Sequence, residues 1–252
     1  ESTVSAALVP RLAGQIELSH LTFGYSELLP PILDDISFRI EPGEFVAVVG
    51  ESGAGKSTLL RLLLGFEKPS RGSVFYDGYD MNNVDVRSLR QQFGVVLQSA
   101  GIMNADIFNN IAGGTGCSLD DAWEAARQAG IADDIAQMPL KMSTPVSMNG
   151  GTISGGQRQR IMIARAIVTN PRILFMDEAT NALDNVSQAV VAENINALKI
   201  TRFVIAHRLS TIRKADRIFV LQNGRIVQTG TFDELSNQNG LFQNLMKRQK
   251  TN

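Results

Sequence analysis

The stretch FVAVVGESGAGKST, residues Phe45–Thr58, decides the fold of this chain. The run FVAVVG is continuously apolar and rich in β-branched residues, which is typical of a strand buried on both faces of a sheet. The residues from Gly50 onward fit the pattern G-x-x-x-x-G-K-[ST], and Lys56–Leu64 has the pattern of a helix. Inward-facing N–H groups of such a glycine-rich turn and the positive end of the helix dipole attract anions. This strand, loop and helix are therefore predicted to bind phosphate groups.

Each position of the predicted phosphate loop has a chemical role. Lys56 is predicted to reach the β- and γ-phosphates of a nucleoside triphosphate, and the hydroxyl of Ser57 is predicted to bind Mg²⁺. Ala54 contributes mainly its backbone. The remaining positions that we assign to phosphate binding are Gly50, Ser52, Gly53, Gly55 and Thr58.

A second element, RILFMDEAT at Arg172–Thr180, is an apolar strand that ends in two carboxylates. Asp177 suits a contact with Mg²⁺, and Glu178 is placed to orient or deprotonate an attacking water. The chain has no Asn-Lys-x-Asp motif for reading guanine, which argues against a GTPase. The pattern favours hydrolysis of another nucleoside triphosphate.

Further apolar runs predict a parallel sheet, because they alternate with helical patterns. The predicted strands are Phe93–Leu97, Ile173–Met176, Phe203–Ala206 and Ile218–Leu221. The predicted helices between them are Leu119–Ala129, Gln157–Val168 and Val186–Leu198. Ser118 with Asp121 and Thr231 with Glu234 indicate capped helix starts, and Asn223-Gly224 indicates a hairpin.

The fold class that follows is α/β, a P-loop NTPase core with a parallel sheet. An antiparallel β subdomain is expected near the N-terminus, from Gln15–Gly43 and Ser73–Gly78, and an inserted α-helical subdomain at about 99–170. We expect a linker at 1–14, a nucleotide-binding domain at 15–248 and a tail at 249–252. The linker composition of the first residues leads us to expect a piece of a longer protein.

The composition excludes several classes of protein. The 252 residues carry 24 Lys and Arg against 25 Asp and Glu, and 44% are hydrophobic. These values argue against disorder, and the balanced charge argues against a nucleic-acid partner. No apolar run approaches the roughly 20 residues of a transmembrane helix. The single Cys117 excludes an internal disulfide framework.

A third motif, ISGGQRQR at Ile153–Arg160, precedes the acidic pair. Together with the phosphate loop and the acidic strand, it resembles the ATP-binding cassette family, the nucleotide-binding domain of ABC transporters. The resemblance extends from about Gln15 to Lys247 and implies ATP and Mg²⁺ as ligands.

The resemblance also assigns roles to further residues. Tyr25 in LTFGY matches an aromatic residue that stacks on adenine. Gln98 matches a glutamine that touches Mg²⁺ and the attacking water, and His207 matches a histidine that holds the γ-phosphate and Glu178. Asp184 ends a NALD stretch that matches the D-loop. The signature residues implied to contact ATP held by a partner domain are Ser154, Gly155, Gly156 and Gln157.

The partners implied by the resemblance are a second copy of the domain and a transmembrane domain. ATP would close two cassettes head to tail into a homodimer, with ATP between each phosphate loop and the opposite signature. The stretch AHRLSTIRKADRI and the N-terminal linker resemble those of exporter cassettes that follow their transmembrane domain in one chain. We therefore expect the transmembrane domain to be fused N-terminally. This implies a location at the cytoplasmic face of the plasma membrane.

Two loops differ from the usual pattern of multidrug exporters. Met148 and Asn149 stand where those proteins carry a Glu-Arg pair, and SAGIM follows Gln98. Both loops resemble those of bacterial peptide and bacteriocin exporters, especially exporters of leader-bearing, microcin-like peptides. The alternatives are a cassette of a multidrug or lipid exporter, an importer, or a soluble ABC ATPase of DNA repair or translation. A cassette that binds ATP without turnover is disfavoured by the pair Glu178 and His207.

Overall fold

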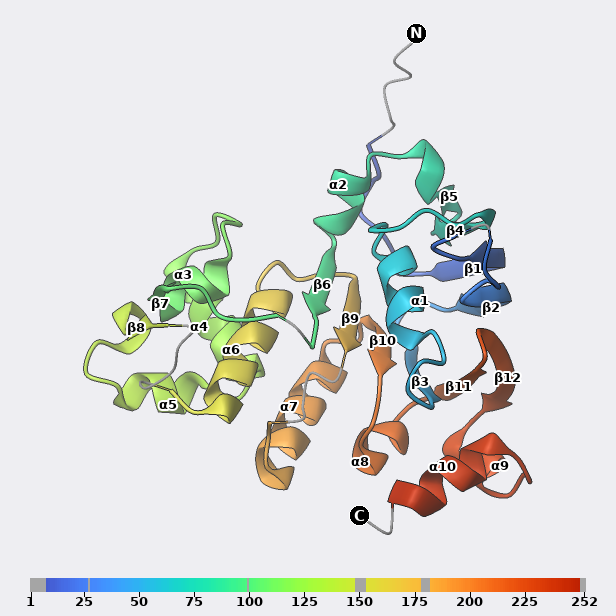
Figure 1. Cartoon of the computed structure of the whole chain (residues 1–252). Coiled ribbons are helices and arrows are strands. Elements are labelled where there is room, and N and C mark those ends of the chain that lie inside the picture. The colour runs from blue at the N-terminus through green and yellow to red at the C-terminus, as the bar shows by residue number, and fades with distance from the viewer. Residues whose placement is uncertain (1–7, 27, 99, 148–152, 178–181, 250–252) are drawn as a thin grey trace, which may run out of the picture. The chain divides into compact units, whose positions relative to one another are not determined.

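A computed structural model describes residues 8–26, 28–98, 100–147, 153–177 and 182–249 (Figure 1). The chain divides into two compact units. Unit 1 comprises Glu1–Gln91 and Thr201–Asn252, and unit 2 comprises Gln92–Ile200. The predicted acidic residue Glu178 and the loop residues Met148 and Asn149 lie outside the described residues.

Unit 1 contains an antiparallel sheet with the strand order β2-β1-β4-β5 (Figure 1). Buried and less buried residues alternate along much of β1, as they do in a sheet with one face against the core. The strands are β1 (Ile16–Phe23), β2 (Leu33–Ile40), β4 (Arg71–Tyr76) and β5 (Tyr79–Asp80). This sheet confirms the antiparallel β subdomain that the sequence predicts.

A second group of strands in unit 1 has the order β12-β11-β3-β10. The strand β3 (Phe45–Gly50) is parallel to both of its neighbours, β10 (Thr201–Ile205) and β11 (Arg217–Gln222). It is buried over Phe45–Val49, in agreement with its apolar run. The antiparallel partner of β11 is β12 (Arg225–Gly230), which confirms the Asn223-Gly224 hairpin.

Short helices follow these strands. Thr231 and Glu234 form the predicted capping box at the start of α9, and the Phe232 and Phe242 rings meet edge to face at 5.7 Å between α9 and α10. The α-helices of unit 1 are α1 (Lys56–Leu63), α2 (Val86–Arg90), α8 (Leu209–Ile212), α9 (Phe232–Ser236) and α10 (Leu241–Gln249), with a 3-10 turn η1 at Met81–Asn83.

Unit 2 pairs β6 (Phe93–Val96) in parallel with β9 (Ile173–Asp177) and carries the longer helices. Ser118 and Asp121 form the predicted capping box of α4. The helices are α3 (Ile107–Ala112), α4 (Leu119–Gln128), α5 (Ala132–Gln137), α6 (Gly155–Ile167) and α7 (Asn185–Ala197). The minor elements are β7 (Ala105–Asp106), β8 (Pro145–Val146) and a 3-10 turn η2 (Lys141–Ser143).

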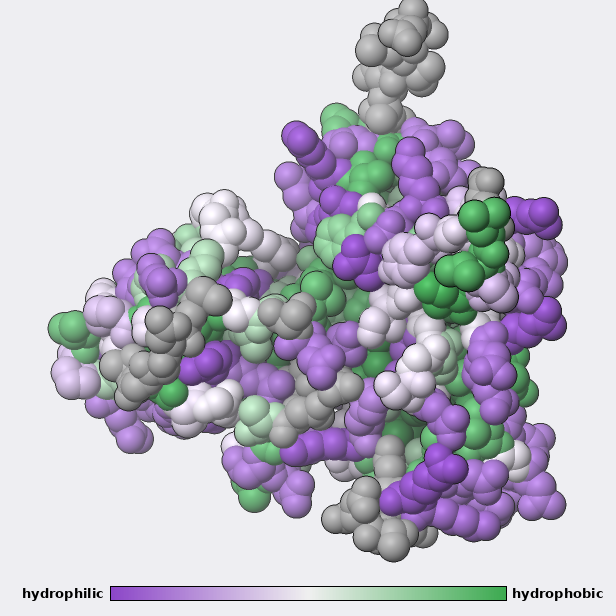
Figure 2. Space-filling view, viewed as in Figure 1, coloured by the Kyte–Doolittle hydropathy of each residue, from purple (hydrophilic) through white to green (hydrophobic). Residues whose placement is uncertain are grey.

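The α/β fold class is confirmed, with a phosphate loop between β3 and α1 as in a P-loop NTPase core. Hydrophilic side chains cover most of the surface that faces the viewer in Figure 2, with smaller apolar patches among them. Tyr25, Leu28 and Leu29 are among the exposed large apolar residues. Among the described residues, none of the helices has the length and apolar character needed to span a membrane.

Candidate nucleotide-binding site

The phosphate loop lies between the end of β3 and the start of α1. Gly55 is the N-cap of α1 and has φ 104°, a left-handed conformation that glycine adopts at little cost. A glycine cap has no side chain to accept hydrogen bonds from the N–H groups of the first turn, and this turn contains no acidic residue. The start of α1 therefore offers backbone donors to an anion.

Lys56 is folded back over this loop. Its side chain is buried, and its Nζ donates to the carbonyl oxygens of Gly50 at 2.8 Å and of Glu51 at 2.9 Å. These contacts hold the ammonium group inside the curve of the loop. The positive charge is thus placed beside the first residues of the phosphate loop.

The β11–β12 hairpin supports the backbone of the phosphate loop. The N–H of Gly224 donates to the carbonyl of Ala54 at 3.2 Å, and the N–H of Asp34 donates to the carbonyl of Gly224 at 2.9 Å. Arg225 Nε also donates to Asp34 Oδ2 at 3.0 Å. The conformation of the loop therefore depends on β2 and on a turn distant in the sequence.

His207 lies at the same sheet edge as the phosphate loop. Ile205 pairs with Val48 in the parallel β10–β3 ladder, so the residues after both strands leave the sheet side by side. His207 follows β10 by two positions and is exposed. Unit 1 thus brings together the phosphate loop and the predicted γ-phosphate histidine.

Tyr25 lies on the segment between β1 and β2, which returns toward the same loop. The carbonyl of Ile32 lies 3.2 Å from the position that a Cβ on Gly55 would take. The Tyr25 ring meets Phe23 edge to face at 4.9 Å and is 61% exposed. Hydrogen bonding to Glu67 raises the pKa of Arg61, a residue of α1, and Tyr25 adds a smaller contribution. An exposed aromatic ring near α1 is available for stacking.

In unit 2, Gln98 and Asp177 lie at one edge of the β6–β9 pair. Val96 pairs with Met176 in this parallel ladder, so Gln98 and Asp177 follow the paired positions on neighbouring strands. Asp177 is only 7% exposed. The carboxylate of Asp177 and the amide oxygen of Gln98 are hard oxygen donors of the kind that Mg²⁺ prefers, and so is the hydroxyl of Ser57 in the phosphate loop. Ser57 belongs to unit 1.

The signature residues form the start of α6. Ser154 Oγ accepts from the N–H of Gln157 at 3.1 Å, and Gln157 Oε1 accepts from the N–H of Ser154 at 2.9 Å. Gly155 and Gly156 lie in the first turn between them. The sequence-based assignment gave Ser154 and Gln157 a role toward phosphate and did not anticipate that their side chains cap their own helix.

The sequence analysis assigned no role to two residues that lie near Ser154–Gln157 in the structure. Asp134 on α5 accepts from Gln157 Nε2 at 2.8 Å, and Gln159 Oε1 accepts from the N–H of Ala182 at 2.9 Å. Gln159 is only 9% exposed although it is polar. Gln159, the second Gln of the stretch GGQRQR, could have been recognised from the sequence, because a glutamine on the buried side of a helix needs a hydrogen-bond partner.

Asp184, predicted to contact nucleotide, caps α7 in this structure. Its Oδ1 accepts from the N–H groups of Val186 at 3.0 Å and Ser187 at 2.9 Å. The hydrogen bond from the Ser187 backbone is the largest cause of the lowered pKa of the Asp184 carboxyl. The carboxylate therefore stabilises the start of α7, next to the predicted D-loop.

Comparisons with known proteins identify the family. The family model described as ABC transporter matches residues 33–181. The chain is 44% identical over 246 residues to the cyclolysin secretion/processing ATP-binding protein CyaB of Bordetella pertussis, covering 96% of this chain and 35% of that protein. It is 42% identical over 245 residues to the ATP-dependent lipid A-core flippase of Methylobacillus flagellatus, covering 96% of this chain and 42% of that protein.

A solved structure of a bacterial Atm1-family ABC exporter with ATP bound aligns with a TM-score of 0.92 and 39% identity. The alignment covers 99% of this chain and 44% of that chain. The chain belongs to the ABC transporter family, and ATPase activity is expected of its ATP-binding domain. It spans less than half the length of the two curated relatives named above.

Proposed function

We propose that this chain binds and hydrolyses ATP as the cassette of an exporter, and that ATP closes two copies into a head-to-tail dimer. The observation that carries the proposal is the start of α1, where the N-cap is a glycine without a side-chain acceptor and Lys56 lies folded over the loop. The family match identifies the nucleotide as ATP.

Each residue then has a defined task. Tyr25 stacks on adenine, and Lys56 moves from the loop carbonyls to the phosphates, which compensate its charge better than neutral oxygens do. His207, exposed beside the loop, holds the γ-phosphate. Glu178 accepts a proton from the attacking water. These roles require positioning and charge compensation, the main contributions in phosphoryl transfer.

Ser57, Gln98 and Asp177 would hold Mg²⁺, which neutralises charge on the β- and γ-phosphate oxygens. The signature at the start of α6 contacts the γ-phosphate of ATP on the other copy. Both copies carry a phosphate loop and a signature, so a symmetric homodimer completes both sites.

The transported substrate is proposed from the relatives. The name of one relative mentions toxin translocation, that of a second mentions cyclolysin secretion/processing, and that of a third mentions a lipid A-core flippase. The first candidate is export of peptides or proteins, among them bacteriocins. The loops at Met148 and Asn149 and after Gln98 resemble those of peptide exporters. Lipid export is the second. In both cases a transmembrane domain, fused N-terminally, would hold the cassette at the cytoplasmic face of the plasma membrane.

The test of the cassette is ATPase activity measured together with the molar mass by light scattering. We expect a monomer without nucleotide, turnover of ATP by the wild-type chain, and an ATP-bound dimer in Glu178→Gln. A dimer that forms equally without ATP, or an absence of turnover, would reject the proposal. The substrate is tested with the full-length protein in vesicles, by comparing stimulation of ATPase activity by leader-bearing peptides and by lipid A.

A further inference from the structure

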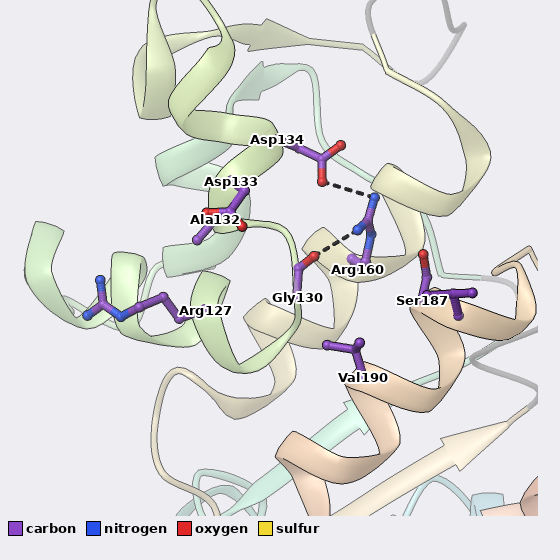
Figure 3. Close-up of a pocket in the computed structure, with 9 residues that line it drawn as sticks. Arg127, Gly130, Ala132, Asp133, Asp134, Arg160, Ser187 and Val190 are labelled. Atoms are coloured by element: carbon purple, nitrogen blue, oxygen red, sulfur yellow. Dashed lines mark hydrogen bonds and ion pairs between the residues drawn. The ribbon is translucent and has the colours of Figure 1, made fainter.

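Asp134 on α5 links two side chains of the signature helix. Its Oδ1 accepts from Gln157 Nε2 at 2.8 Å, and its Oδ2 lies 3.2 Å from a terminal nitrogen of Arg160. The other terminal nitrogen of Arg160 donates to the carbonyl of Gly130 at 2.7 Å. Figure 3 shows Arg160 between Asp134 and Gly130, with dashed lines to both.

This network borders a pocket of about 390 Å³ within unit 2 (Figure 3). Arg160 is nearly buried, with 14% of its side chain exposed, and Asp134 is exposed to 30%. A partly buried ion pair is screened less by solvent than a fully exposed one. The network therefore restrains α6 more firmly than a surface ion pair would.

The orientation of the Gln157 amide depends on Asp134. The capping box needs Oε1 of Gln157 to face the N–H of Ser154, because only the oxygen accepts a hydrogen bond. An ionised carboxylate accepts but cannot donate, so Asp134 binds the NH₂ group and directs the oxygen toward Ser154. Without the carboxylate, the hydrogen bond from the Ser154 N–H alone would orient the amide, so the amide would be held less firmly.

We propose that Asp134 is a positioning residue for ATP bound between two copies, acting through Gln157 and Arg160. The inference rests on the proposed function, in which the start of α6 contacts the γ-phosphate of ATP held by the other copy. Asp134 touches no nucleotide in this account. It fixes the capping box, and the capping box sets the direction in which the first turn of α6 presents its N–H groups.

The neighbouring Asp133 provides a matched control. It lies in the same first turn of α5, carries the same charge, lines the same pocket and is exposed. Asp133→Ala and Asp134→Ala remove the same charge from the same helix terminus, so the helix dipole is affected alike. Only Asp134→Ala removes the acceptor of Gln157 and the partner of Arg160.

The experiment measures two quantities for the wild-type chain, Asp133→Ala, Asp134→Ala and Asp134→Asn. The first is the affinity of dilute, monomeric chain for a fluorescent ATP analogue. The second is the protein concentration at which ATPase activity is half-maximal under saturating ATP. We expect nucleotide affinity within about twofold of wild type in all variants, because unit 1 supplies the phosphate loop and Tyr25.

The half-maximal protein concentration should rise about 10-fold in Asp134→Ala, the size of one charge-assisted hydrogen bond, and stay unchanged in Asp133→Ala. The half-maximal concentration of Asp134→Asn should lie between those of wild type and Asp134→Ala. Its amide oxygen can still accept a hydrogen bond from Gln157, but the neutral amide cannot form an ion pair with Arg160. A general loss of folding would instead weaken nucleotide binding by the monomer.

Equal concentration dependence of Asp134→Ala and Asp133→Ala would overturn the positioning role while leaving the cassette function intact. If Asp134→Ala does not fold, a wild-type concentration dependence of the ATPase activity of Asp134→Asn would likewise overturn the positioning role. A wild-type chain whose activity is independent of its own concentration would instead refute the ATP-dependent dimer, and the role of Asp134 with it.

Discussion

Gly224→Ala should damage both the stability of the fold and the phosphate loop. Gly224 is the second residue of the β11–β12 turn and has φ 74°. A Cβ on Gly224 would lie 2.1 Å from the carbonyl oxygen of Ile32, far inside van der Waals contact. Either the turn or β2 must move, and both backbone hydrogen bonds of Gly224, to Ala54 and Asp34, are then strained.

The size of the loss follows from these contacts. A left-handed alanine costs about 1–2 kcal/mol, and each backbone hydrogen bond contributes about 0.5–1.5 kcal/mol. The expected decrease in the free energy of unfolding is therefore about 2–5 kcal/mol. For a chain of this size, that corresponds to a decrease in Tm of roughly 4–20 °C.

Gly78→Ala is the matched control. Gly78 lies in the β4–β5 turn with φ 81°, and a Cβ added to it would have no atom within 4 Å beyond its immediate chain neighbours. The free energy of unfolding of this variant should decrease only by the cost of a left-handed alanine, about 1–2 kcal/mol. Urea unfolding of both variants gives the two free energies, and titration with a fluorescent ATP analogue gives the affinities.

We expect weaker nucleotide binding in Gly224→Ala than in Gly78→Ala, because the N–H of Gly224 donates to Ala54 in the phosphate loop. Equal losses of unfolding free energy in the two variants would refute the steric argument. Wild-type affinity in a Gly224→Ala variant that has lost stability would show that the hydrogen bond to Ala54 does not shape the site.

Three further predictions concern the assigned residues. Tyr25→Ala should weaken ATP binding by about 1–3 kcal/mol, the range for aromatic stacking on a base, whereas Tyr25→Phe keeps most of the affinity in an equilibrium titration; equal affinity for Tyr25→Ala and wild type would remove the stacking role. Glu178→Gln should lower turnover by roughly 10²-fold or more with ATP affinity retained, whereas Asp177→Asn should lower both in steady-state ATPase and binding assays; near-wild-type turnover in Glu178→Gln would show that another group activates the water. Met148→Ala should leave the ATPase activity of this chain nearly unchanged and alter transport by the full-length protein; loss of ATPase activity in the isolated chain would place Met148 in the site or the core.

Much of the fold could be predicted from the sequence because its signals are local. The run Phe45–Val49 is buried as its composition requires, and the capping boxes at Ser118 and Thr231 form between residues three positions apart. The Asn223-Gly224 turn likewise follows from the φ values that these residues tolerate. Each of these elements is determined by a few consecutive residues.

The supports of the site could not be predicted, because they join residues distant in the sequence. The pattern ISGGQRQR led us to assign Gln157 to phosphate, yet its amide lies between Ser154 and Asp134, and Asp134 is 23 positions away. Gly224 reaches the phosphate loop from the far end of the chain. Side-chain chemistry predicts which groups need a partner, and only the packing of α5 and of the hairpin shows which partner they have.

The two helix starts assigned to phosphate satisfy their backbone donors differently, which implies an order of binding. The α1 start is capped by Gly55, which supplies no side-chain acceptor, so the first turn has most to gain from a phosphate. The α6 start already satisfies N–H groups through the Ser154–Gln157 capping box. Phosphate at α1 therefore meets a helix start without a capping side chain, while phosphate at α6 meets donors that are partly occupied. In the proposed dimer, this difference favours ATP binding first at the phosphate loop of one copy, with the signature of the other copy joining afterwards.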